Sequence, residues 1–288
     1  MAGLVLAAQG QTLPEKLKTR IGDFPGTVSL YAKNLDTGAT VQIRGSEPVR
    51  TASTIKLPIL CAISDAVAHD KAKWTELLTV TATEKVTGSG IIGSEFSDGV
   101  QLPLSDVAHL MMVLSDNTAT NMILERFGSD MVNSYLDHIG ITTTRSMRKI
   151  LGAAEPKLSA AGKLPENQKY GLGRSTPRDM VTILEKLEQG EIVSPEASKE
   201  ILAIMKRCHD NTGIRRHMGT TTVINKTGGL DALRSDVGIV YSKTGRIAMA
   251  ITVDDIPKPD WSPDNPGNLL IADLATLLVD GLATSARK

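Results

Sequence analysis

Ser53-Thr54-Ile55-Lys56 stands where an irregular segment enters an apolar stretch of helical spacing, residues 55–68. Positions three apart share one face of a helix, so the Lys56 amine is expected beside the Ser53 hydroxyl. A serine needs a neighbouring base to become a nucleophile, and burial can lower the pKa of a lysine enough to make it that base. A serine that caps the helix and a lysine on its surface would give the same four residues. The stretch therefore indicates a catalytic site only in combination with other motifs.

Ser115-Asp116-Asn117 lies at the break between two apolar helical stretches, 106–114 and 118–127. Asp and Asn are good helix N-caps, and capping of the second stretch is a sufficient structural explanation of this motif. For the first stretch, the expected N-cap is Ser105. A catalytic interpretation places both Ser115 and Asn117 in a cleft. Ser115 would then pass a proton to a leaving nitrogen, and Asn117 would hold a substrate amide.

Lys226-Thr227-Gly228-Gly229 follows directly after a β-branched run, residues 220–224. Small residues at a strand edge allow a substrate backbone to approach closely. Lys226 offers a positive charge and Thr227 a hydroxyl for a carboxylate, while the Gly229 and Ser53 amides could form an oxyanion hole. A second Lys-Thr-Gly triplet, 243–245, falls between two alternating strands, where turn formation explains it.

Strand patterns occur at both ends of the chain and helical patterns between them. Residues 27–32 and 40–43 form one expected hairpin, 237–241 and 247–253 another, and 268–282 a closing helix. The economical arrangement is one antiparallel sheet with an inserted helical domain. We therefore expect an α/β (α+β) fold with a sheet domain, 13–48 and 208–288, and a helical domain, 49–207. The site is expected in the cleft between them, with the irregular stretch 152–174 as a functional loop.

Composition and charge exclude several classes of protein. Lys plus Arg equals Asp plus Glu, 32 against 32, and aromatic residues make up 3%, so nucleic-acid binding is not expected. No apolar run is long enough to span a membrane. Cys61 and Cys208 lack metal-ligand spacing, and Gly88 to Gly93 matches G-x-G-x-x-G without the flanking strand and helix that a dinucleotide site needs. No cofactor or metal is expected.

The motifs S-x-x-K, S-D-N and K-T-G, in this order, resemble those of class A β-lactamases and penicillin-binding proteins. The resemblance implies that Ser53 is acylated, that Lys56 is the base or its relay, and that Ser115 protonates the lactam nitrogen. It also implies a substrate-binding group that comprises Asn117, Lys226, Thr227, Gly228 and Gly229.

The loop of the chain departs from the family pattern. The family's R-x-E-x-x-L-N string, whose glutamate activates the deacylating water, is absent. Its nearest match places Glu155 in that catalytic role, and Glu166 is a second candidate. Three arginines compete to bind a substrate carboxylate: Arg215, Arg216 and Arg234.

The resemblance therefore predicts β-lactam hydrolysis through a Ser53 acyl-enzyme. Two alternatives stay open: a penicillin-binding sensor that is acylated without turnover, and a related esterase or D-Ala-D-Ala carboxypeptidase. The expected partner is a β-lactam or a peptidoglycan-like substrate, bound by a monomer. Residues 4–8 resemble the end of an export signal, so a periplasmic or secreted location is expected.

Overall fold

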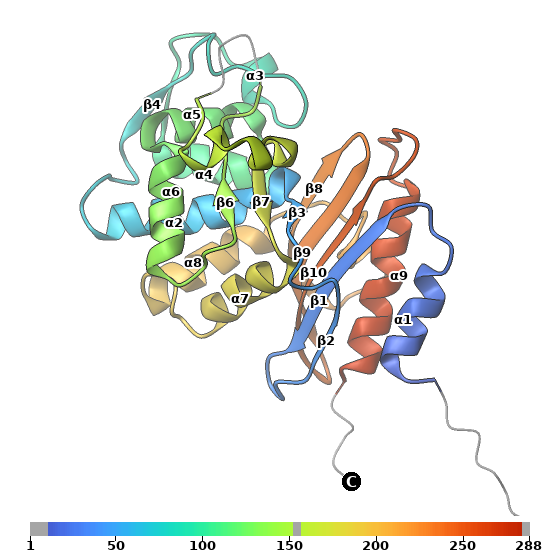
Figure 1. Ribbon diagram of the computed structural model, residues 1–288. Helices are drawn as coiled ribbons and strands as arrows, with labels where there is room; N and C mark the ends of the chain where they lie inside the picture. Colours follow the sequence, from blue (N-terminus) through green and yellow to red (C-terminus); the bar gives the residue numbers. More distant parts are fainter. Residues whose placement is uncertain (1–10, 152–156, 284–288) are drawn as a thin grey trace, which may run out of the picture.

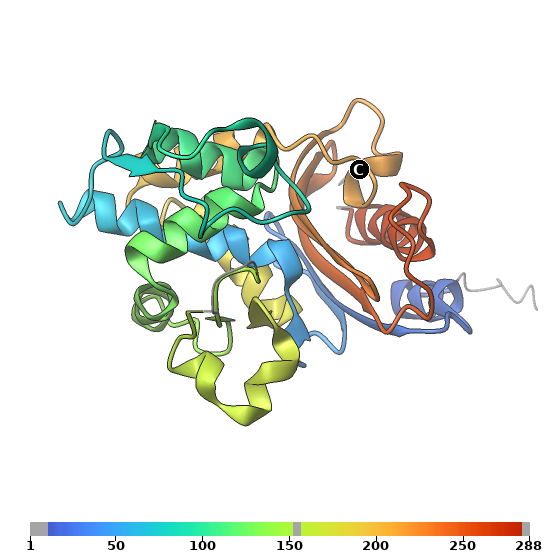
Figure 2. The ribbon, with the colours of Figure 1, turned by 90° about the horizontal axis from the view of Figure 1, so that it is seen from above.

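The computed structural model describes residues 11–151 and 157–283, in which one large sheet separates two groups of helices. Figure 1 shows the helices from the middle of the chain on one side of the sheet and the first and last helices on the other. Figure 2 shows the same arrangement from above, with the sheet seen nearly edge-on between the two groups. The expected α+β fold with an antiparallel sheet is confirmed.

The large sheet joins the two ends of the chain. Its strand order is β2-β1-β10-β9-β8, and every neighbouring pair is antiparallel. The first strand lies beside the last, with Thr27 opposite Asp254. The bounds are β1 (Thr27–Asn34), β2 (Thr40–Ile43), β8 (Thr222–Leu230), β9 (Leu233–Ser242) and β10 (Gly245–Asp254). The triplet 243–245 sits at the β9–β10 turn, as predicted.

Both faces of the sheet are covered, so its central strands are buried almost continuously instead of alternating. On one face, α9 (Pro266–Gly281) packs against the sheet through apolar side chains that include Leu270, Leu274 and Leu278. Helix α1 (Leu13–Ile21) packs against α9. On the other face, α7 (Pro177–Glu188) packs against β1 and β10.

The helical part surrounds α2 (Lys56–Ala68), which is buried along most of its length. Two later helices begin at side-chain N-caps: the Thr176 and Ser194 hydroxyls accept from the amides of Asp179, at 3.0 Å, and Ala197, at 3.1 Å. The remaining helices are α3 (Ile92–Glu95), α4 (Leu104–Val113), α5 (Asn117–Phe127), α6 (Ser129–His138) and α8 (Pro195–Lys206). Short 3-10 turns are η1 (Ala52–Ile55), η2 (Ala161–Lys163), η3 (Pro165–Tyr170) and η4 (Ile214–His217).

The prediction that Ser105 caps α4 is wrong. The helix begins at Leu104, and Pro103 precedes it. The Leu104 amide donates to the Glu76 carbonyl at 2.7 Å, and the Ser105 amide donates to the Trp74 carbonyl at 3.0 Å. The preceding chain therefore satisfies the amides that a side-chain cap would have satisfied.

Five short strands form two small sheets that the sequence analysis did not predict. One contains β3 (Val49–Arg50), β7 (Gly173–Ser175) and β6 (Arg145–Ser146), and the other pairs β4 (Leu77–Thr79) with β5 (Gln101–Pro103). Strands of two or three residues are too short to show a periodic pattern.

Cys61 and Cys208 are both buried free thiols. In the described ranges, no group of His, Cys, Asp and Glu side chains is arranged to hold a metal ion. None of the helices over the same ranges has the length and apolar character needed to cross a bilayer.

Candidate active site

One cleft of about 800 Å³ gathers the three sequence motifs. Its wall is formed by η1, the turn between α4 and α5, and strand β8. Seven predicted site residues line it: Ser53, Ser115, Asn117, Lys226, Thr227, Gly228 and Gly229. Lys56 is fully buried, and Glu155 lies outside the described residues.

Ser53 lies in η1, where the chain turns into α2. The residue before it, Ala52, has a φ of +45°, a left-handed backbone that costs energy in a residue with a side chain. Strand β8 passes very close to this turn. A Cβ at Gly228 would lie 2.9 Å from the Ser53 nitrogen and 2.8 Å from the Thr51 oxygen, so only glycine allows this approach. The motif glycine thus brings the strand backbone to the nucleophile.

Lys56 is buried with neutral hydrogen-bond partners. Its Nζ donates to the Ser115 carbonyl at 2.7 Å, to the Ser115 Oγ at 3.2 Å and to the Asn117 Oδ1 at 3.0 Å. Burial and the nearby charge of Lys226 hold the pKa of Lys56 well below its usual value. A lysine in this setting can be neutral and can accept a proton.

Ser115 lies between two lysines. Its Oγ accepts from Lys56 Nζ at 3.2 Å and from Lys226 Nζ at 3.0 Å. A hydroxyl oxygen has two lone pairs and one proton, so both lone pairs are occupied and the proton is left to donate. Ser115 lines the cleft, where that proton can reach a leaving group.

The turn at 115–117 is held by the buried carboxylate of Asp116. It accepts from the amides of Ala119, at 2.8 Å, and of Ile91 and Ile92, at 2.7 and 2.9 Å. Asp116 therefore caps α5, as the structural explanation of the motif required. Asn117 lines the cleft, where its Oδ1 accepts from Lys56 and its Nδ2 donates to the Thr87 carbonyl at 3.2 Å. The capping explanation is confirmed for Asp116, and the catalytic interpretation of Ser115 and Asn117 stays a prediction.

The G-x-G-x-x-G match serves the same turn. Gly88 and Gly90 have φ values of +97° and +108°, and Gly90 lies so close to Asp116 that a Cβ there would be 2.3 Å from its carboxylate oxygen. The Ser89 carbonyl accepts from the Asn117 amide at 3.0 Å. These glycines let the segment wrap the motif turn. The strand before them, β4, ends at Thr79 and the helix α3 spans only Ile92–Glu95, so the strand, tight turn and long helix of a dinucleotide site are not formed.

Thr227 and Lys226 lie within β8, whereas the sequence analysis placed them after the strand. The Thr227 hydroxyl donates to Asp210 Oδ2 at 2.7 Å. Asp236, directly across from Thr227 on β9, is fully buried, and burial raises its pKa to about 7.

The three candidate arginines differ in position. Arg234 lines the cleft, where its guanidinium stacks on the Trp261 ring, 4.7 Å from the ring centroid. Arg215 donates to the Val223 carbonyl and Asn225, and Arg216 pairs with Asp264. Of these three candidates, Arg234 is the one that lines the cleft.

The loop glutamates have different outcomes. Glu166, in η3, is exposed and does not line the cleft, and its neighbour Asn167 is buried in contacts with Ala161 and Arg174. Across residues 11–151 and 157–283, the acidic side chains that line the cleft are aspartates, and none is a glutamate.

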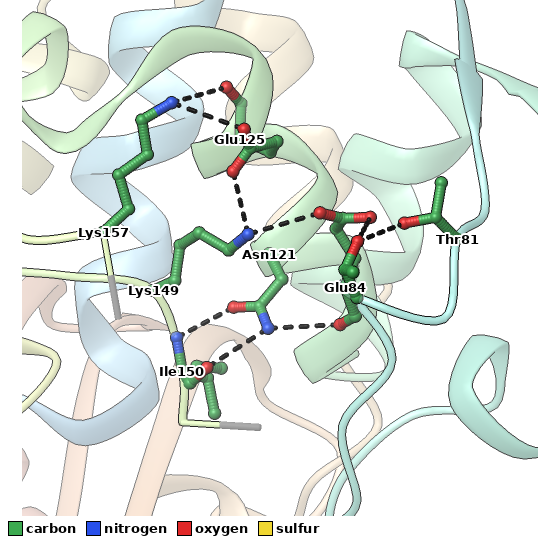
Figure 3. Close-up of polar contacts among 8 residues, drawn as sticks. Thr81, Glu84, Asn121, Glu125, Lys149, Ile150 and Lys157 are labelled. Atoms are coloured by element: carbon green, nitrogen blue, oxygen red, sulfur yellow. Dashed lines mark hydrogen bonds and ion pairs between the residues drawn. The ribbon is translucent and has the colours of Figure 1, made fainter. Parts of the chain in front are cut away.

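Ile150, which lines the cleft on the loop side, is held by Asn121 of α5. The Asn121 Oδ1 accepts from the Ile150 amide at 2.8 Å, and its Nδ2 donates to the Ile150 carbonyl at 3.2 Å. Next to it, the buried Lys149 pairs with Glu84 at 3.3 Å and Glu125 at 2.9 Å (Figure 3). These contacts fix the chain at 149–150 against α5.

Glu125 also pairs with Lys157, at 3.4 Å. One glutamate of α5 therefore forms ion pairs with a lysine before and a lysine after residues 152–156. Sequence reasoning missed this cluster. Its one visible signal is Asn121, a polar residue in an apolar helix, which the extended motif S-D-N-T-A-T-N contains.

Comparisons with known proteins identify the family of the chain and match its overall fold. The sequence profile of the β-lactamase enzyme family matches residues 12–282. A curated β-lactamase of Mycobacterium tuberculosis is 26% identical over 98% of this chain and 87% of its own length. A solved β-lactamase from Sphaerobacter thermophilus is 25% identical, covers 94% of this chain and 96% of its own, and has a TM-score of 0.80. A PBP-A mutant solved as an acyl-enzyme complex with penicillin G is 30% identical to this chain, covers 93% of this chain and 95% of its own, and has a TM-score of 0.78.

The charge of Lys226 is expected to set the pH at which Ser53 becomes reactive. Acylation needs neutral Lys56, so its rate rises as pH passes upward through the Lys56 pKa. Lys226→Met removes a like charge that lowers this pKa, and the rising limb of the rate should shift to higher pH. The measurement is the pH profile of acylation by a neutral nitrophenyl ester.

Lys169→Met is the matched control, since Lys169 lines the same cleft but is exposed to solvent. It should leave the limb in place. If the rising part of the pH profile stays in place or moves to lower pH in Lys226→Met, the charge of Lys226 does not lower the pKa of the group that controls acylation.

Proposed function

Because the chain belongs to the β-lactamase enzyme family, we propose that it hydrolyses β-lactams through an acyl-enzyme on Ser53. The family makes it a serine β-lactamase-type hydrolase of the class A type. The observation that carries the proposal is the buried Lys56 amine, which lies one helical turn from Ser53 and bonds Ser115 and Asn117.

Acylation follows from these positions. The Ser53 Oγ attacks the lactam carbonyl while its proton moves to the neutral Lys56 amine. The oxyanion accepts from the Ser53 and Gly229 amides. The proton then passes through Ser115, 3.2 Å from Lys56, to the lactam nitrogen as the C–N bond breaks.

Substrate binding uses the remaining cleft residues. We assign the acylamido group of the substrate to Asn117 and its carboxylate to Lys226 and Thr227, with Gly228 and Gly229 as the close-approach edge. Water then hydrolyses the ester with Glu155 as general base, which frees Ser53 and forms the penicilloic acid.

The location, assembly and domain division belong to the same proposal. A periplasmic or secreted monomer fits a protein that meets β-lactams, and residues 4–8 have the composition of the end of an export signal. We place the domain boundaries at 48/49 and 207/208, on either side of the helical part. A peptidoglycan-like peptide is a further substrate class that the same acylation machinery would accept.

A second candidate function is a penicillin-binding protein whose acyl-enzyme persists. Ile150, the loop residue that Asn121 holds at the cleft, is apolar, and no glutamate lines the cleft in the described part of the chain. The solved PBP-A relative was captured as an acyl-enzyme with penicillin G, which shows that such an adduct is stable in that mutant.

Intact mass against time with benzylpenicillin tests the proposed function. The wild type should gain the mass of the antibiotic and then lose it, with continuing penicilloate formation. Ser53→Ala should gain no mass, because the attacking oxygen is gone. Ser89→Ala, which removes another cleft serine, is the control and should still be acylated. Labelling of Ser53→Ala would refute the assigned nucleophile, and an adduct that never clears from the wild type would favour the second candidate.

Glu155→Gln should slow release of the acyl group by about 10²–10⁴-fold and leave acylation unchanged, because a general base typically contributes this much. The same time course measures it. Glu166→Gln is matched in chemistry but exposed outside the cleft, so it should release at the wild-type rate. Equal release by both variants would remove Glu155 from the mechanism.

Ile150→Glu should speed release by roughly tenfold or more, because it adds a carboxylate at a cleft position that Asn121 already fixes. Leu151→Glu, one residue further, adds the same charge without that backbone contact and is expected to give less. A slower or unchanged release in Ile150→Glu would show that this position does not face the ester.

A further inference from the structure

The hydroxyl assigned to the substrate's carboxylate is already bonded to a carboxylate of the chain. Thr227 Oγ1 donates to Asp210 Oδ2 at 2.7 Å. The other oxygen of Asp210 accepts from the amide of Thr212, at 2.9 Å, and from its hydroxyl, at 2.7 Å. Asp210 is therefore held on both sides, with one oxygen directed at Thr227.

Asp210 is ionised in this position. Burial opposes the charge, but the hydrogen bonds from Thr212 and Thr227 and the nearby Lys226 bring the pKa of Asp210 below its usual value. The residue lines the cleft and its surface is exposed, so its charge acts directly on what enters.

A second carboxyl group lies on the neighbouring strand, β9. Asp236 is the cross-strand partner of Thr227 and also lines the cleft. It is fully buried and accepts from the Ile214 amide at 2.8 Å and from Asn225 Nδ2 at 3.1 Å. Thr227 thus has an acidic residue on either side.

The positively charged side chains beside Thr227 are bonded to other groups of the chain. Lys226 bonds Ser115 and the Thr227 carbonyl. The guanidinium of Arg234 donates to backbone carbonyls of residues 230, 233 and 260 under the Trp261 ring. Among the described residues, no arginine donates to Thr227, Asp210 or Asp236.

We propose that Asp210 is a specificity-determining residue that competes with a substrate's carboxylate for the Thr227 hydroxyl. It lowers the preference of the cleft for an anion over a neutral group at that position. The proposal rests on the proposed function, since it concerns the same subsite.

The physical basis is a difference between substrates. An anionic substrate must break the Thr227–Asp210 bond and place its charge near another carboxylate, which repels it. A neutral ester of the same substrate avoids that repulsion. The unfavourable contact selects against one substrate without improving the binding of the other.

The test compares benzylpenicillin with its methyl ester in wild type and Asp210→Asn. For each, intact mass gives the second-order rate constant of Ser53 acylation. Asparagine keeps the size and an acceptor for Thr227 but removes the charge. The ratio of the acid rate to the ester rate should rise by about tenfold, which corresponds to about 1.4 kcal/mol.

Asp23→Asn, which removes an exposed carboxylate outside the cleft, controls for net charge and should leave the ratio unchanged. Asp210→Ser gives a second neutral variant in case Asp210→Asn folds poorly, and it should raise the ratio as well. An unchanged or lower ratio in folded variants that react with both compounds would overturn the proposal. If the wild type reacts with neither compound, the proposed function fails instead.

Discussion

The burial of Lys56 is the constraint around which the site is built. An amine removed from water needs hydrogen-bond partners, and Lys56 finds them in the backbone and side chain of Ser115 and in Asn117. These contacts fix α2 to the turn between α4 and α5. Since Ser115 also accepts from Lys226, the same hydroxyl connects that turn to β8. Within the cleft, Ser115 therefore links the helical part to the sheet by hydrogen bonds.

Two buried lysines show how partners decide a role. Lys149 pairs with the carboxylates of Glu84 and Glu125, and these contacts anchor the loop against α5. Lys56 has only neutral acceptors and a like charge nearby, so burial disfavours its charged form. The same type of side chain forms structural ion pairs at position 149 and is proposed as a base at position 56, because its neighbours in the two places differ in charge.

Features that depend on neighbouring residues were predictable from the sequence. The hairpins and the helix that follows Ser53 depend on local periodicity and turn residues. Contacts between distant segments were not predictable: Asn121 with Ile150, and Thr227 with Asp210. Ser105 failed as a cap for the same reason, since amide partners came from the preceding segment. The three motifs predicted residues that line the cleft, but not the other charged side chains that line it with them.

The place of β1 beside β10 has a consequence for the order in which the protein is made. The first strand emerges from the ribosome more than two hundred residues before its partner, since Thr27 pairs with Asp254. Contacts so distant in sequence form late, whereas the helices of the middle segment have their neighbours close by. The serine and its lysine can therefore be in place while β8 is still missing. The active site is completed by the last third of the chain, so a truncated product would hold the nucleophile without the strand that positions the substrate.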